Sequence, residues 1–322
     1  MRSLRPLSLC LLALLLVAGC GSASDDDGPA RPGSVKVVAT TTQVADFVRA
    51  VGGERVEVVQ VLQPNSDPHD YEPRPDDVRA LLDAPLVFES GDDLDAWMAK
   101  VVEASGADPR VVTLAATNIT HVAGEESGSE ASRYDAHWWH DPRNVEAAIP
   151  VIRDALSRAN PSVASVYARN ARAYLEQIRR LDAGIAACMR HVPAAQRKLV
   201  TDHDAFGYFA RRYGIDVVGA VIPSQTTAAQ PSAGDVAQLT DTIRRERVLA
   251  VFPEHSLSRK LAQAIARETG ASSAYTLYGD TLGPADSDGA TYLAMERHNA
   301  DAMVQGFSGG GERCRFDAAG AR

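Results

Sequence analysis

Histidine and aspartate residues in predicted loops give this sequence its strongest chemical signal. The eight histidines are residues 69, 121, 137, 140, 191, 203, 255 and 298. Three of them, and one aspartate, follow predicted strands: His69, His137, His203 and Asp280. In open α/β sheets, ligand sites form beyond the carboxyl ends of the strands, so these side chains could meet there. Neutral imidazole nitrogens and a carboxylate suit a tetrahedral Zn²⁺ site. Spacing alone does not establish the site, because the four positions are far apart in the sequence.

The segments that must position these residues alternate between strand and helix patterns. In the first part of the chain we expect strands at 35–39, 55–62, 86–88 and 111–114, and helices at 43–51, 75–82, 94–103 and 144–159. In the second part we expect strands at 199–201, 215–222, 248–252 and 273–277, and helices at 204–213, 233–246, 257–269 and 290–306. Such alternation is typical of a parallel sheet that is covered by helices.

Between these two parts, residues 162–190 contain no helix breaker except Gly184, and apolar residues recur at three- and four-residue steps. We therefore predict an α/β fold of two lobes, each a mostly parallel sheet with flanking helices, joined by one long linking helix. The expected boundaries are 35–159 for the N-terminal α/β lobe, 160–190 for the linking helix and 191–322 for the C-terminal α/β lobe. The lobes are expected to face each other across a cleft.

The N-terminus has the pattern of an export signal. Basic residues precede an apolar run that is too short to span a bilayer as a helix, and the run ends in Val-Ala-Gly-Cys, which resembles a bacterial lipobox. We predict a lipoprotein signal peptide at 1–19, lipidation of Cys20 and a disordered tether at 20–34. An ordinary signal peptide with an incidental cysteine is the alternative. Either way, the protein is expected to be exported; with the lipid, it is a membrane-anchored lipoprotein facing the extracytoplasmic space or periplasm.

The cysteines indicate a disulfide, and the net charge argues against one class of binding partner. With Cys10 in the signal and Cys20 assigned to lipid, Cys188 and Cys314 remain as a pair in an oxidising compartment, and we predict a disulfide between them. The formal charge of −9 argues against nucleic-acid binding, which needs a basic surface.

Four motifs resemble the metal loops of a known family. They are 67–77 (DPHDYEPRPDD), 135–144 (DAHWWHDPRN), 201–214 (TDHDAFGYFARRYG) and 277–283 (LYGDTLG). In this order they are similar to the periplasmic zinc- and manganese-binding proteins of ABC importers, the cluster that contains ZnuA and TroA. The resemblance covers about residues 35–307, and the second motif looks closest to the AztC-type zinc branch.

The resemblance implies that His69, His137, His203 and Asp280 are the metal ligands. Manganese members of the family commonly have Glu at the third position, where this chain has His203, so we expect one Zn²⁺ per chain. His140 and Glu254 are candidates for groups that contact the ligands, because a metal-bound histidine usually donates its other N–H to an acceptor. His140 could alternatively be a ligand. The loop 120–133 is expected to be a solvated acidic loop.

The function implied by the resemblance is capture of Zn²⁺ between two lobes and delivery to an ABC permease. The expected partners are that permease with its ATPase and, as a further candidate, a zinc metallochaperone; the protein is expected to be a monomer and not an enzyme. Alternatives are a manganese-specific binding protein or a metal-dependent surface adhesin. A zinc hydrolase would need an open coordination position and a general base such as Glu254, and no His-Glu-x-x-His pattern is present. Zinc affinity should fall as the pH drops through the histidine range near 6.5.

Overall fold

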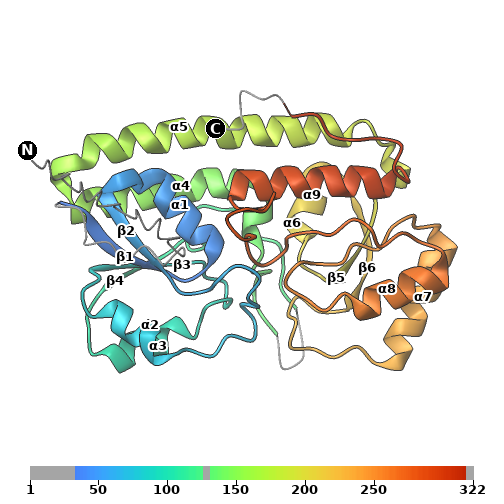
Figure 1. The fold of residues 1–322 in the computed structure, drawn as a ribbon, viewed down its shortest axis with the longest axis horizontal. Coiled ribbons are helices and arrows are strands. Elements are labelled where there is room, and N and C mark those ends of the chain that lie inside the picture. The colour runs from blue at the N-terminus through green and yellow to red at the C-terminus, as the bar shows by residue number, and fades with distance from the viewer. Residues whose placement is uncertain (1–32, 126–130, 317–322) are drawn as a thin grey trace, which may run out of the picture. The chain divides into compact units, whose positions relative to one another are not determined.

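The computed structural model describes residues 33–125 and 131–316. The predicted signal peptide, Cys20 and nearly all of the predicted tether therefore lie outside the described residues. None of the helices in the described part of the chain has the length and apolar character needed to cross a membrane. Figure 1 shows two sheets, each flanked by helices, with one long helix running beside both.

The N-terminal lobe is built on a four-stranded parallel sheet. Its strands are β1 (Val35–Ala39), β2 (Val56–Gln60), β3 (Leu86–Glu89) and β4 (Arg110–Thr113), in the order β2-β1-β3-β4. Its helices are α1 (Thr42–Gly52), α2 (Pro75–Leu81), α3 (Met98–Ser105) and α4 (Pro142–Ala159). β1 and β3 are almost fully buried, as expected of central strands covered on both faces.

The C-terminal lobe contains the parallel strands β5 (Lys198–His203) and β6 (Asp216–Ile222). Its helices are α6 (Gly207–Tyr213), α7 (Ala233–Glu246), α8 (Lys260–Thr269) and α9 (Tyr292–Phe307). The segments 248–252 and 273–277 are not regular strands, so that prediction is wrong in detail. They continue the sheet through isolated parallel bridges, Thr201 with Phe252, Ala250 with Ser272 and Glu254 with Leu277.

The long helix α5 (Ala164–Met189) joins the lobes and follows a short 3-10 turn at Pro161–Val163. Its first half is bonded to the N-terminal lobe, where the Tyr167 hydroxyl donates to the Arg55 carbonyl. Its second half is bonded to α6, because Asp182 accepts hydrogen bonds from Arg212 and Tyr213. The predicted α/β class with a long linking helix is therefore confirmed.

One apolar core runs through both lobes. The main cluster of buried side chains includes Phe47 and Trp138 from the N-terminal lobe, Ile178 from α5, and Phe252 and Met303 from the C-terminal lobe. Cys188 and Cys314 are joined by a disulfide, with their Cα atoms 5.3 Å apart, and the bond attaches the chain after α9 to the end of α5. The lobes are thus packed against a common helix rather than connected by an open hinge.

Candidate metal centre

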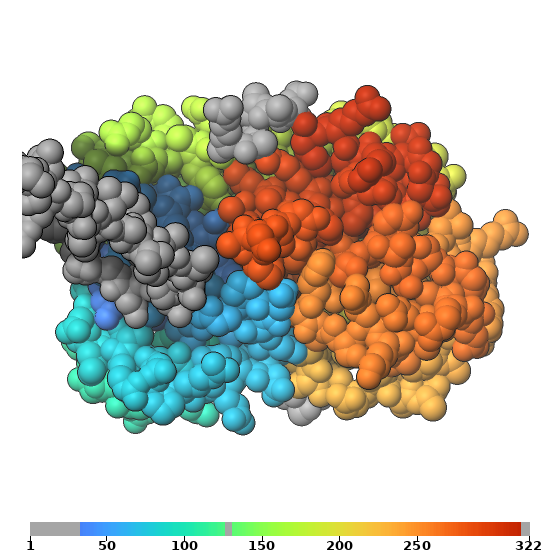
Figure 2. Space-filling view, viewed as in Figure 1, coloured from blue at the N-terminus to red at the C-terminus, as the bar shows by residue number. Residues whose placement is uncertain are grey.

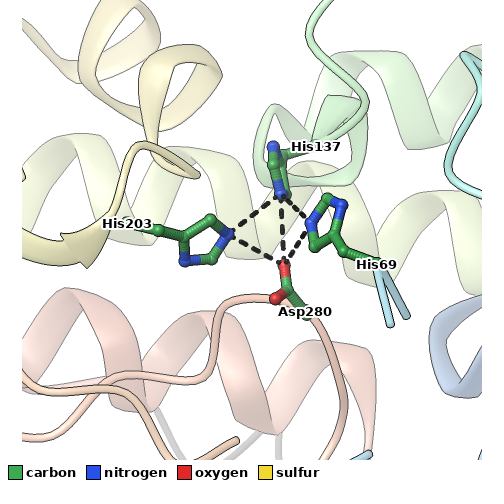
Figure 3. Close-up of side chains that lie close together, drawn as sticks. All are labelled: His69, His137, His203 and Asp280. Atoms are coloured by element: carbon green, nitrogen blue, oxygen red, sulfur yellow. Dashed lines mark hydrogen bonds and ion pairs between the residues drawn. The ribbon is translucent and has the colours of Figure 1, made fainter. Parts of the chain in front are cut away.

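Four side chains from four separate loops converge between the lobes (Figure 3). They are His69, His137, His203 and Asp280, and one ligand atom from each lies within 4.8 Å of the others. The Nε2 atom of His137 is 3.3 Å from the Nε2 atoms of both His69 and His203. No other group of three or more potential ligands with this proximity occurs in the described residues.

The Asp280 carboxylate completes this cluster. Its Oδ1 atom lies 3.1 Å from Nε2 of His137, 3.4 Å from that of His203 and 3.8 Å from that of His69. Tetrahedral coordination at the usual Zn–N and Zn–O distances separates ligand atoms by roughly 3.3–3.4 Å. The five separations that the structure gives, 3.1–3.8 Å, therefore fit one small tetrahedral cation.

Three of the four residues lie in loops or beside a turn, and His203 is the last residue of a strand. His203 ends β5, and His137 directly precedes the 3-10 turn Trp138–His140. His69 lies in the loop between β2 and α2, and Asp280 lies between the bridge residue Leu277 and α9. Placement at the ends of parallel strands brings loops that are distant in sequence to one edge, as the sequence predicts.

Carboxylates orient two of the imidazoles. The Nδ1 atom of His137 is 2.7 Å from Asp135 Oδ1, and that of His203 is 2.8 Å from Glu254 Oε1. Because a carboxylate oxygen accepts, the proton stays on Nδ1, and Nε2 is the atom left to bind a metal. The Glu254 backbone N–H in turn donates to Asp202.

Close packing requires a glycine beside the His203–Glu254 pair. A Cβ atom at Gly279 would overlap the carboxylate of Glu254. The Gly279 carbonyl accepts from the Trp139 indole N–H, and the Asp280 carbonyl accepts from the Gln43 amide. These contacts fix the backbone that carries the acidic ligand.

Burial and charge favour a bound cation. Burial alone would raise the pKa of the Asp280 carboxyl group, but the neighbouring imidazoles, above all His203, hold that pKa well below its usual range. Burial lowers the pKa of His137, yet Asp135 and Asp280 outweigh it and raise that pKa to about 9. Both Asp280 side-chain oxygens are buried and accept no hydrogen bond from the described residues. When the three imidazoles are neutral, their Nε2 lone pairs face this buried carboxylate. A divalent cation would satisfy all four groups.

His140 does not face this cluster. Its Nδ1 atom is 2.8 Å from Glu296 Oε1 on α9, and its ring stacks on Phe206. Burial lowers its pKa to about 3 and raises that of Glu296 well above the usual range. The His140 side chain is therefore hydrogen-bonded to Glu296 and not to any of the four candidate ligands, although its backbone N–H donates to the His137 carbonyl.

Two residues at the site were missed in the sequence. Asp135 accepts both the Nδ1–H and the backbone N–H of His137, and the only signal was an acid two positions before a histidine. Glu125, expected in a solvated loop, instead accepts hydrogen bonds from Ser224 and the Gln225 backbone in the other lobe. The entrance beside His69 is a cavity of about 280 Å³ whose lining includes Pro68, Asp92 and Thr226.

A buried cluster of potential metal ligands between two α/β lobes is typical of metal-binding substrate-binding proteins. The sequence profile of the family described as "Zinc-uptake complex component A periplasmic" (ZnuA) matches residues 37–306, and the chain belongs to this family. It is a metal-binding, substrate-binding protein of ABC importers, a family of transport proteins and not of enzymes.

Similar proteins differ in the metal that their names state. The chain is 31% identical over 299 residues to the manganese-binding lipoprotein MntA of Halalkalibacterium halodurans, covering 92% of this chain and 96% of that protein. It is 33% identical over 273 residues to the iron-binding protein YfeA of Yersinia pestis, covering 84% and 86%. The solved structure of the periplasmic zinc-binding protein TroA from Treponema pallidum superposes with a TM-score of 0.78 at 30% identity, covering 85% of this chain and 99% of that one.

Proposed function

We propose that this protein captures one Zn²⁺ between its lobes through His69, His137, His203 and Asp280, and delivers it to an ABC permease for zinc uptake. The observation that carries the proposal is the cluster itself: three imidazole Nε2 atoms and one buried carboxylate at tetrahedral separations. Four protein ligands leave no open position for a catalytic water, so such a site binds the ion without reacting it. Three neutral nitrogen ligands also favour zinc over manganese.

In this proposal, His69 is the last of the four residues to bind the captured ion. The His69 side chain is 9% exposed, whereas those of the other three residues are completely buried. The loop that carries His69 contacts the opposite lobe, because Asp67 accepts from the Thr227 hydroxyl and the Asn65 N–H donates to Thr281. In Figure 2, the light-blue surface of the N-terminal lobe meets the orange surface of the C-terminal lobe. The metal enters and leaves on the His69 side, and docking to the permease favours the arrangement in which this loop is released.

The N-terminal signal supports an extracytoplasmic location. We infer that Cys20 carries lipid and anchors the mature protein to the membrane, in agreement with the name lipoprotein borne by MntA. We also propose that the chain belongs to the AztC-type zinc branch, which the motif at 135–144 resembles, and that a zinc metallochaperone can load the site. The disulfide between Cys188 and Cys314 agrees with an oxidising compartment.

A competition titration tests the metal. The chelator-stripped mature protein is titrated with Zn²⁺ and Mn²⁺ together, and bound metal per chain is measured. One tightly bound Zn²⁺ that Mn²⁺ does not displace is expected, and His191→Ala, which changes an exposed histidine outside the cluster, serves as the matched control. Loss of tight metal binding in the wild type would overturn the capture site.

Manganese is the second candidate, because MntA, which is named for manganese, is as similar to this chain as the zinc-named TroA. Displacement of Zn²⁺ by equimolar Mn²⁺ would favour it. That outcome would keep the importer role and overturn the argument from the third imidazole. Replacing His203 by Glu should then weaken zinc binding without weakening manganese binding, since a carboxylate suits manganese better than imidazole does.

A further inference from the structure

The outer side of α5 carries a positive charge that contrasts with the rest of the protein. Residues 164–190 contain five arginines and two acids, while the chain has 42 acids against 33 basic residues. One of the acids, Asp182, is neutralised by Arg212 at 2.5 Å. The exposed arginines Arg169, Arg172 and Arg180 form no hydrogen bond or ion pair with other described residues, and Glu176 is the one acid beside them on the exposed side of α5.

Three further exposed arginines lie near the two ends of α5: Arg158 in the last turn of α4, Arg190 at the C-cap of α5, and Arg315 near the end of the described chain. The name arginine face is used here for Arg158, Arg169, Arg172, Arg180, Arg190 and Arg315. Arg180 and Arg315 also line a cavity of about 520 Å³ against Gly184 and Phe316. At 1.5 Å per residue, the face extends about 30 Å along α5, from Arg169 to the C-cap residue Arg190.

The described chain begins next to the same helix. The side-chain amide of Asn160, directly before the turn that leads into α5, donates to the Gly33 carbonyl at 2.9 Å. Cys20 precedes Gly33 by thirteen residues in the sequence. A lipid at Cys20 would therefore hold the arginine face near a bilayer surface.

We propose that the arginine face of α5 binds the anionic surface of a phospholipid bilayer. Phosphate-bearing headgroups attract arginine, and each arginine that reaches an anionic surface strengthens binding by roughly fivefold. The attraction acts within about 10 Å at 0.1 M salt, so it needs this face to lie flat on the membrane. The physiological effect rests on the lipid anchor of the proposed function, but the binding itself does not.

The consequence is a preferred orientation of the anchored protein. In Figure 1, α5 lies along one edge of the described part, and α2, α3 and α7 lie along the opposite edge. The cavity at His69 is lined by residues outside α5. With the arginine face on the bilayer, this entrance faces the surrounding solution, where free cations are collected. Delivery to the permease then requires the anchored protein to leave this orientation.

Vesicle sedimentation tests the proposal. The mature chain with Cys20→Ser, which cannot be lipidated, is mixed at 20 mM NaCl with vesicles of phosphatidylcholine containing 30% phosphatidylglycerol, or of phosphatidylcholine alone. Binding to the anionic vesicles is expected to be at least tenfold tighter and to disappear at 0.5 M NaCl. The variant Arg169→Gln/Arg172→Gln/Arg180→Gln should lose about tenfold or more.

A matched control variant distinguishes the effect of the arginine face from the effect of total charge. The variant Arg110→Gln/Arg245→Gln/Arg267→Gln removes the same charge from exposed positions outside α5 and should bind as the wild type does. The proposal would be overturned by equal losses in both variants, by equal binding to both kinds of vesicle, or by no binding to anionic vesicles. The last result would favour an acidic protein as the partner of the arginine face. Zinc titration of the same variants should be unchanged, so a failed metal site and a failed membrane face are distinguishable.

Discussion

His203 and His69 belong to the same cluster but differ in burial and in hydrogen-bond partners. His203 is fully buried, its Nδ1 is 2.8 Å from Glu254, and its backbone N–H also faces that carboxylate. His69 is partly exposed, and no described side chain forms a hydrogen bond with its Nδ1 atom. His137 resembles His203, with Asp135 in place of Glu254. The difference teaches that the cluster has a preorganised inner part and one outer ligand on a loop.

Removal of a ligand should have the largest effect and should reveal this difference. We expect His203→Ala, His137→Ala and Asp280→Ala each to weaken zinc binding by more than ~100-fold, because loss of a ligand exceeds the 10–100-fold cost of losing a partner of a ligand. His69→Ala should cost about tenfold less than His203→Ala, since water can reach its position. Competition titration against a chelator measures all four. A loss in His69→Ala as large as in His203→Ala would remove the distinction between inner and outer ligands.

Protons should compete with zinc for the inner ligands over a higher pH range than the sequence suggests. Asp135 and Asp280 raise the pKa of His137 to about 9, against the opposing effect of burial, and Glu254 and Asp280 raise that of His203. Below pH 9 the metal-free site therefore holds a proton that zinc must displace, and affinity should fall about tenfold per pH unit for each proton released. Titrations between pH 6 and pH 9 test this expectation. A constant affinity down to pH 7 would contradict it.

The carboxylate partners should matter only for the inner imidazoles. Asp135→Asn and Glu254→Gln should each weaken zinc binding by about 10–100-fold. They should also shift the pH dependence of binding downward, because the opposing charge is lost. Asp67→Asn provides the control, since Asp67 bonds the backbone of His69 rather than its ring, and should cost less than about tenfold. Calorimetric melting of the metal-free variants shows whether any loss reflects folding instead.

A third buried imidazole should act on stability and not on metal. Burial keeps His140 neutral, with a pKa of about 3, and keeps Glu296 protonated, so the pair holds one proton. The unfolded chain holds none above pH 6.5 and two below about 4.3. The free energy of unfolding should therefore fall by about 1.4 kcal/mol per pH unit on both sides of that window. Glu296→Gln should make the decline above pH 6.5 shallower by about 1.4 kcal/mol per pH unit in denaturant titrations of the metal-free protein, while zinc affinity stays unchanged. The slope that remains comes from groups such as His137, whose pKa is also raised in the folded protein. An unaltered decline would contradict the assignment.

The sequence revealed the residues of the cluster better than their surroundings. His69, His137, His203 and Asp280 could be found because parallel strands place their carboxyl-end loops at one edge, and because four ordered motifs match a family. The partners could not be found. Glu254 was suggested by resemblance, but Asp135 and Glu296 are acids whose roles depend on side-chain directions that no periodic pattern encodes.

The same limit applies to the C-terminal sheet. Strands were predicted at the apolar segments 248–252 and 273–277, but only isolated parallel bridges form. One joins Phe252 to Thr201 of β5, and the other two, Ala250 with Ser272 and Glu254 with Leu277, join the two segments to each other. Pro253 follows the first segment and has no N–H to extend a ladder, although its carbonyl accepts from Leu277. Hydrophobicity thus identifies a buried segment, whereas the length of a ladder depends on backbone donors that the pairing register selects.

The continuous core along α5 has a consequence for the time that a metal ion stays bound. Because both lobes pack on one helix, and the disulfide attaches the chain after α9 to the end of that helix, separation of the lobes would expose apolar side chains at a high free-energy cost. Spontaneous escape of the ion then depends on motion of the His69 loop alone. We expect slow dissociation in the free protein and a long residence time, so that the pool of loaded molecules acts as a zinc reserve until a permease opens the loop.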